Sequence, residues 1–117
     1  MGIEFDHAED GFARLKMRVE EPHTQLANTA HGGVLATIAD AAAAQALITV
    51  LKDNEFFSTV ELNLNYLSPA NPGESIIGEG RIIQRGGRIA VGDMEVKEES
   101  SGRLIVKGLQ TFIIIRS

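Results

Sequence analysis

The chain has 117 residues, which suits one domain and is too short for two. Its formal charge of −5 argues against a nucleic-acid-binding domain, and the absence of cysteine excludes disulfides, zinc thiolates and a cysteine nucleophile. The first residues, MGIEFDHAED, are acidic and lack the apolar core of a signal peptide. The most apolar stretch, 33–51, contains Asp40, Gln45 and seven alanines and is a poor membrane span. We therefore expect a cytoplasmic protein with neither a membrane nor a nucleic-acid partner.

The first half of the chain predicts two strands and one long helix. Alternating apolar residues indicate strands at 3–8 and 12–20 around the turn Glu9-Asp10-Gly11. A polar loop follows, and the apolar run predicts a helix from about Gly33 to Leu51.

The second half predicts four strands with short turns between them. Their expected ranges are 59–66, 75–84, 88–98 and 103–115. This order indicates an α+β domain in which an antiparallel sheet of five to six strands wraps around one long central helix. Because one helix cannot cover both faces of such a sheet, and its edges stay open, we expect oligomerisation.

Strand 59–66 alternates cleanly between apolar and polar residues. The apolar positions are Val60, Leu62, Leu64 and Tyr66, and the polar ones are Thr59, Glu61, Asn63 and Asn65. The pattern predicts that the four polar side chains share one face, which is either solvated or part of an interface.

Asp40 is the only charged residue between Gly32 and Leu51, in a segment that is apolar nearly all round and so is expected to be a core helix. Burying a carboxylate costs several kcal/mol, on the order of the ion-burial penalty, unless it is paired, protonated or facing a wet cleft. One interpretation is a structural acid bonded to a neighbouring strand. The other is a general base or nucleophile in a cleft.

Gly32 and Gly33 fall where the helix begins, so their N–H groups lie among the unpaired donors of its first turn and point at any anionic ligand there. The alternative is that the glycines only permit tight packing, and His31 before them can equally be structural.

Roughly 12 Å of helix axis separates Gly32 from Asp40. Both can act on one small ester only if Asp40 comes from a second subunit. No second ligand lies at a suitable spacing from His31, so no metal site is expected.

Two blocks of sequence resemble a known family. Residues 25–40, QLANTAHGGVLATIAD, and 59–74, TVELNLNYLSPANPGE, look like the paired signature of PaaI-type hotdog-fold acyl-CoA thioesterases. The resemblance covers about residues 12–115 and implies a single hotdog thioesterase domain over 1–117. It further implies an acyl-CoA substrate, no separate cofactor, and a homo-oligomer built from hotdog dimers and commonly tetrameric.

The resemblance also implies roles for individual residues. Gly32 N–H and Gln25 would polarise the thioester carbonyl, His31 would support that pocket, Asp40 would be the catalytic carboxylate from the partner subunit, and Thr59 would position water. The expected substrate-binding residues are Gly33, Asn28, Ser68, Arg85 and Arg88. For the two arginines the alternative is a plain hairpin tip.

The match has departures: Gln25 is the less usual residue, Asn28 stands where glycine is common, and Ala44 replaces a threonine found in another branch. The two rival hypotheses are a non-catalytic acyl-CoA-binding module and a hotdog enoyl-thioester hydratase.

Overall fold

The computed structural model describes residues 2–20 and 31–117. Within them the elements follow the expected order. The strands and helix are β1 (Glu4–Glu9), β2 (Phe12–Arg18), α1 (Gly32–Ile48), β3 (Glu55–Tyr66), β4 (Ser75–Arg85), β5 (Ile89–Glu98) and β6 (Leu104–Arg116). The helix ends at Ile48 rather than Leu51, and β3 begins at Glu55 rather than Thr59.

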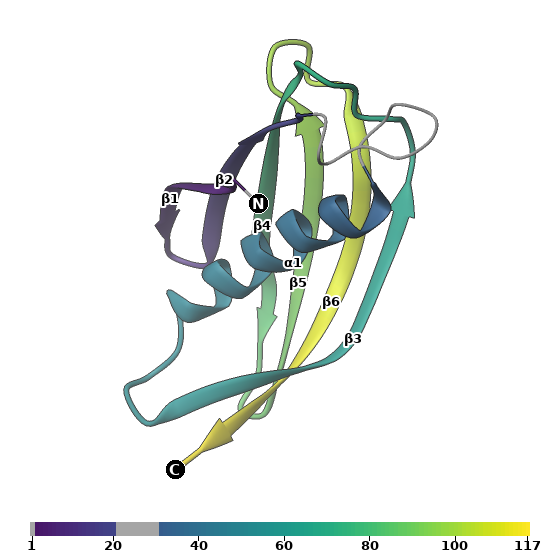
Figure 1. The fold of residues 1–117 in the computed structure, drawn as a ribbon. Coiled ribbons are helices and arrows are strands. Elements are labelled where there is room, and N and C mark those ends of the chain that lie inside the picture. The colour runs from purple at the N-terminus through teal and green to yellow at the C-terminus, as the bar shows by residue number, and fades with distance from the viewer. Residues whose placement is uncertain (1, 21–30) are drawn as a thin grey trace.

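The strands form one antiparallel sheet of six strands in the order β1-β2-β4-β5-β6-β3. The sheet curves around α1, which crosses its concave face (Figure 1). This confirms the predicted α+β class and the sheet wrapped around a single long helix. Strands β1 and β3 are the edges of the sheet. Within the described part of the chain, no helix has the length and hydropathy of a membrane span.

Close approach between α1 and β4 depends on two glycines. A Cβ atom added at Gly80 would lie 2.6 Å from backbone atoms of Ala42, and one added at Gly78 would lie 2.8 Å from Cγ1 of Ile38. On the helix side, the contact face is largely alanine, with Ala39, Ala42 and Ala43 fully buried. Small residues on both elements therefore let the helix lie directly on the sheet, and this packing sets the helix's position.

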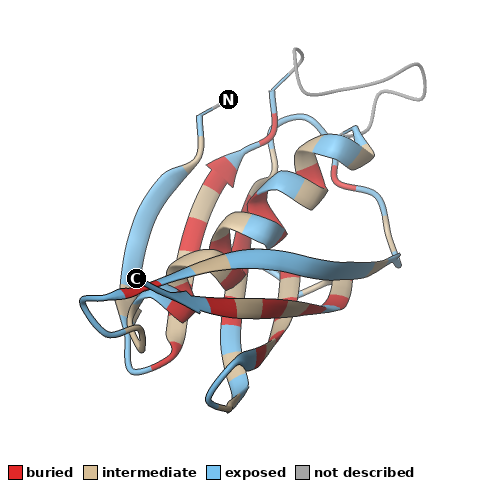
Figure 2. Cartoon of the chain, turned by 90° about the horizontal axis from the view of Figure 1, so that it is seen from below, coloured by how far each residue is buried: buried red, intermediate tan, exposed pale blue. Residues whose placement is uncertain are grey.

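The helix covers only part of the concave face. Its residues Gly33, Thr37, Asp40 and Ile48 are exposed. The expectation of a core helix buried all round is therefore wrong for the single chain. On the uncovered side, β3 is exposed along most of its length (Figure 2). Its large apolar side chains stay open to solvent, with exposed fractions of 55% for Phe56, 60% for Val60, 39% for Leu62 and 54% for Tyr66.

A β-bulge at Val60 changes which residues of β3 share a face. Thr59 pairs with Phe112 of β6 while Glu61 pairs with Thr111, so Val60 is an extra residue in the ladder. Thr59 therefore faces the helix side of the sheet, together with Leu62, which pairs with Gln110. The prediction that Thr59 shares a face with Glu61, Asn63 and Asn65 is wrong, because an inserted residue reverses the alternation.

Candidate active site

One buried amide joins Asp40 and Thr59. Nε2 of Gln110, on β6, donates hydrogen bonds to Oδ1 of Asp40 at 2.7 Å and to Oγ1 of Thr59 at 2.9 Å. Gln110 is only 1% exposed, whereas Asp40 and Thr59 are both exposed to solvent. Three elements thus bring together two of the residues expected to act on substrate.

Sequence reasoning missed Gln110. A signal for it exists in β6, where the residues that face the helix are otherwise apolar or glycine. Those residues are Val106, Gly108, Phe112 and Ile114. A glutamine in such a row needs a hydrogen-bonding partner, since buried polar groups without one are costly.

Asp40 is exposed in the single chain, so the fold of one protomer does not bury this acid. The reason is geometric, because Asp40 projects from the part of α1 that has no strand over it. Within the described residues, the neutral Gln110 amide is its hydrogen-bond donor, and no cation pairs with its carboxylate. Its second oxygen, Oδ2, stays available to accept a proton from a ligand.

The start of α1 leaves one backbone donor free. Nδ1 of His31 accepts a hydrogen bond from the Gly33 N–H at 3.2 Å, and the His31 carbonyl accepts from Val34 and Leu35. Within the described residues, the Gly32 N–H has no partner. A helix N-terminus favours negative charge, so this N–H is suited to a developing oxyanion. His31 therefore caps the helix. The two adjacent glycines differ, because the Gly33 N–H is bonded to His31, whereas the Gly32 N–H has no partner among the described residues.

Packing does not explain why residues 32 and 33 are glycines. A Cβ atom at Gly32 would lie 3.7 Å from the Tyr66 ring, and one at Gly33 would lie 3.5 Å from Nδ1 of His31. Both are ordinary contacts, so the described residues leave room for alanine at each position. The Tyr66 hydroxyl also donates to the Gly32 carbonyl at 3.2 Å, which ties the end of β3 to the start of the helix.

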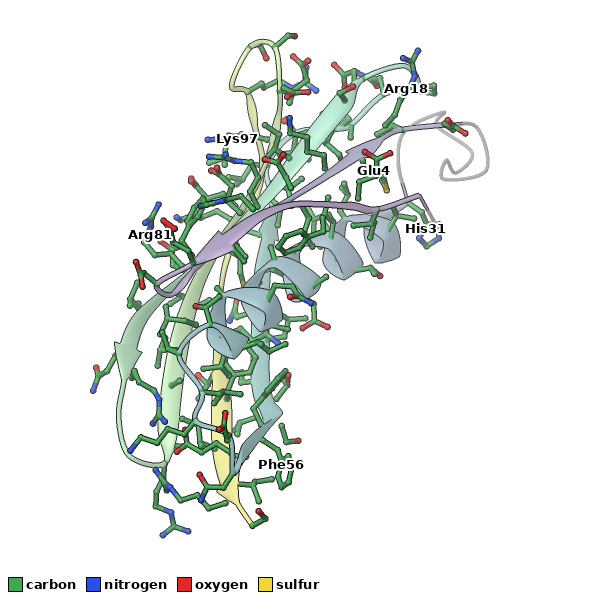
Figure 3. All side chains as sticks on the ribbon, turned by 90° about the vertical axis from the view of Figure 1, so that its left-hand side faces the viewer. Glu4, Arg18, His31, Phe56, Arg81 and Lys97 are labelled. Carbon is green, nitrogen blue, oxygen red and sulfur yellow. The ribbon has the colours of Figure 1, made fainter. Side chains whose placement is uncertain are left out.

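The structure does not bring the remaining described candidates to Asp40. Nη2 of Arg85 lies 2.5 Å from Oε1 of Glu55, beyond the C-terminal end of α1. Figure 3 shows His31 at the start of α1, and it shows Phe56, which is the sequence neighbour of Glu55, far from His31. The Ser68 hydroxyl donates to the Leu104 carbonyl at 2.8 Å, and Arg88 is exposed between β4 and β5.

Glu55 is the buried centre of an ion cluster whose two arginines, Arg85 and Arg116, are partly exposed. Its side chain is fully buried, and Nη2 of Arg116 lies 2.9 Å from its Oε2. The Lys52 backbone N–H, followed by the Arg85 guanidinium, lowers the pKa of Glu55 against the opposing effect of burial. Arg85 thus has a structural partner, which sets it apart from Arg88.

Two predicted site residues, Gln25 and Asn28, lie outside the described residues. Among the residues that are described, no three His, Asp or Glu side chains are grouped so as to hold a metal ion.

Comparison with known proteins decides the family. The model of the thioesterase superfamily matches residues 27–105. The chain belongs to the thioesterase superfamily.

Among its thioesterase relatives, acyl-coenzyme A thioesterase 13 from Mus musculus is 34% identical over 96 residues, which are 82% of this chain and 68% of the relative. The crystal structure of thioesterase superfamily member2 from Mus musculus is 30% identical, with a TM-score of 0.86 over 95% of this chain and 80% of that one. A hypothetical thioesterase from Streptococcus pneumoniae, solved with coenzyme A, has a TM-score of 0.90 at 21% identity, over 99% of this chain and 88% of that one. These matches confirm the hotdog-type thioesterase resemblance and the fold.

Proposed function

We propose that this chain is an acyl-CoA thioesterase in which Asp40 drives hydrolysis. The observation that carries the proposal is the Asp40 carboxylate, held by Gln110 beside Thr59 on an open face of the helix. The name of its mouse relative and the coenzyme A in the streptococcal structure support the choice of substrate.

The proposed reaction begins with a water molecule beside Asp40. As general base, the carboxylate takes a proton from this water, and the resulting hydroxide attacks the thioester carbonyl carbon. Thr59 positions the water. The C–S bond then breaks, and the coenzyme A thiolate leaves and takes up a proton. In the alternative course, the carboxylate itself attacks the carbonyl carbon, and the C–S bond breaks with loss of the coenzyme A thiolate, which takes up a proton. Water then hydrolyses the resulting mixed anhydride and regenerates the Asp40 carboxylate.

The oxyanion formed by either course needs a donor, and the Gly32 N–H is the one proposed, assisted by Gln25. One such donor contributes a rate factor of about 10²–10³. His31 supports it by occupying the neighbouring Gly33 N–H. Glycine at position 32 lets the substrate carbonyl approach without meeting a side chain.

The site is proposed to form between two subunits. About 12 Å of helix axis separates Gly32 from Asp40, so one small reacting centre cannot touch both residues of one chain. The exposed edge strand β3 supports a dimer, because an unpaired edge with large apolar side chains is a surface that a second copy can cover. Pairing of dimers into a tetramer is a further part of this proposal, as is the cytoplasm as its location.

Arg88 is the proposed contact for the phosphates of coenzyme A, since it is exposed, whereas Arg85 is paired with Glu55. A guanidinium suits phosphate because its planar donors match two oxygens at once. Gly33 and Ser68 are weaker candidates, since the Gly33 N–H and the Ser68 hydroxyl already have partners.

A panel of acyl-CoA esters, followed by release of free thiol, tests the proposal. We expect turnover by the unmodified protein and a loss of about 10²-fold or more in kcat for Asp40→Asn, as is typical when a general base is removed. The matched control is Asp53→Asn, an exposed aspartate beyond the end of α1, which should retain full activity. No turnover of any ester, or full activity of Asp40→Asn, would refute the assignment.

The same samples separate the two rival hypotheses. Tight binding of acyl-CoA without thiol release would indicate a binding module. Loss of the double bond of an enoyl-CoA without thiol release would indicate a hydratase.

A further inference from the structure

We infer that Gln110 is a positioning residue, which sets the orientation of the Asp40 carboxylate and of the Thr59 hydroxyl for the reaction. The inference rests on the proposed thioesterase function. It starts from the two hydrogen bonds of one Nε2 atom, at 2.7 and 2.9 Å, to residues on two different elements.

The charge of Asp40 determines which way round the amide lies. An ionised carboxylate can only accept hydrogen bonds, so the atom of Gln110 that faces it must be the –NH2 group and not the carbonyl oxygen. The –NH2 group has two hydrogens, and the two contacts use both of them. Gln110 thus has no freedom to flip while Asp40 is ionised.

This orientation fixes the role of the Thr59 hydroxyl. Because Oγ1 accepts from Gln110, the hydroxyl proton is left to be donated elsewhere, and within the described residues it has no acceptor. A water molecule held by that proton can donate its own proton to Oδ2 of Asp40. Gln110 thereby sets the direction of each hydrogen bond in the proposed network. The amide donates to Thr59, Thr59 donates to the water molecule, and the water molecule donates to the Asp40 carboxylate.

The arrangement has a cost that packing alone would avoid. Oε1 of Gln110 is buried, and no hydrogen-bond partner for it is found in the described part of the chain. A buried carbonyl without a partner destabilises the folded protein, whereas an apolar side chain of similar shape carries no such cost. Gln110 lies between Gly108 and Phe112 on the core-facing side of β6, a position at which an apolar side chain is expected. A positioning role explains why a polar residue occupies this place.

The substitution Gln110→Met tests the inference, because methionine has a similar length and no donor. We expect Tm to be unchanged or higher, kcat to fall about 10- to 100-fold, and KM to stay within about twofold, since the change acts on the base and not on substrate binding. The matched control is Gln84→Met, an exposed glutamine on β4, which should keep both parameters.

A second variant keeps the test decisive if methionine disturbs the fold. In Gln110→Glu, the introduced carboxyl can donate to Asp40 only when protonated, so its activity relative to the unmodified protein should fall as pH rises. Combining Gln110→Met with Thr59→Ala should lower the logarithm of kcat by less than the sum of the two single decreases, because both residues act in one network.

The outcomes separate this inference from the proposed function. Turnover by the unmodified protein, with kcat of Gln110→Met unchanged, would overturn the positioning role alone. A flat activity ratio for Gln110→Glu across pH would also overturn it. Failure of the unmodified protein to hydrolyse any acyl-CoA would overturn the proposed function and the inference with it.

Discussion

The Gly33 N–H donates to Nδ1 of His31 at 3.2 Å, at the very start of α1. The residue before the helix thus satisfies one of its first donors, as N-cap residues do. Because this contact involves Gly33 and not Gly32, the backbone N–H groups of the two adjacent glycines differ in whether they can donate to a ligand. Of these two N–H groups, only that of Gly32 has no partner among the described residues.

This difference predicts opposite outcomes for two alanine substitutions. In Gly32→Ala the new methyl group fits against Tyr66 at 3.7 Å, so the fold should tolerate it, but it restricts approach of the acyl oxygen to the N–H. We expect kcat/KM to fall about 10- to 100-fold, less than or equal to the value of one oxyanion donor, with Tm kept. Gly33→Ala should retain most of its activity. Equal losses in the two variants would contradict the assignment of the oxyanion donor to Gly32.

The burial of Glu55 predicts a pH-dependent contribution to stability. Because its pKa in the folded protein is lowered from 4.5, Glu55 stabilises the fold fully above pH 4.5, and this contribution is lost as pH falls through the lowered pKa. Glu55→Gln should therefore lower Tm at pH 7, and the difference from the unmodified protein should narrow below pH 4.5. Thermal unfolding between pH 3 and 7 measures this. Glu61→Gln, at an exposed site on β3, is the control, and a Tm difference that does not change with pH would contradict the prediction.

Substitutions at Arg85 and at Arg88, which are close in sequence, should change different properties, namely stability for Arg85 and substrate binding for Arg88. Arg85→Gln removes a partner of buried Glu55, so we expect a lower Tm. Arg88→Gln should leave Tm and kcat unchanged and raise KM for acyl-CoA about two- to fivefold, the scale of one exposed ion pair. High salt should shrink that KM difference, since salt screens exposed charges. An unchanged KM for Arg88→Gln at low salt would leave Arg88 without a substrate role.

The order of the elements was predictable from sequence because each of them carries a clear local period. The site was only partly predictable, because its geometry depends on non-local features. The bulge at Val60 moves Thr59 to the helix side of the sheet, and no local pattern marks it. The contact between Asp40 and Gln110 joins residues 70 positions apart in the chain. The exposure of Asp40 follows from where the helix lies on the sheet, and a helix rich in alanine on every side does not reveal that position.

A charge placed on the β3 edge should separate assembly from folding. Val60 and Ile83 are matched sites, with exposed fractions of 60% and 55% and each at a bulge in its strand. If β3 forms the subunit interface, Val60→Lys should shift the protein towards monomer and lower its activity, while Ile83→Lys should leave the dimer active. Light scattering gives the mass, and thiol release gives the activity. A fully active monomer of Val60→Lys would contradict the shared site.

Mixing two damaged subunits tests the shared site most directly. In a dimer of one Asp40→Asn chain and one Gly32→Ala chain, one site combines both defects, and the other combines an intact Asp40 with an intact Gly32. Random pairing makes half of the dimers mixed, each with one intact site, so co-expression should restore about a quarter of the activity of the unmodified protein. If each site were built within one chain, every site would carry one defect and no activity would return. Co-expressed samples with only the summed activity of the two single variants would therefore place Asp40 and Gly32 of each site in the same subunit.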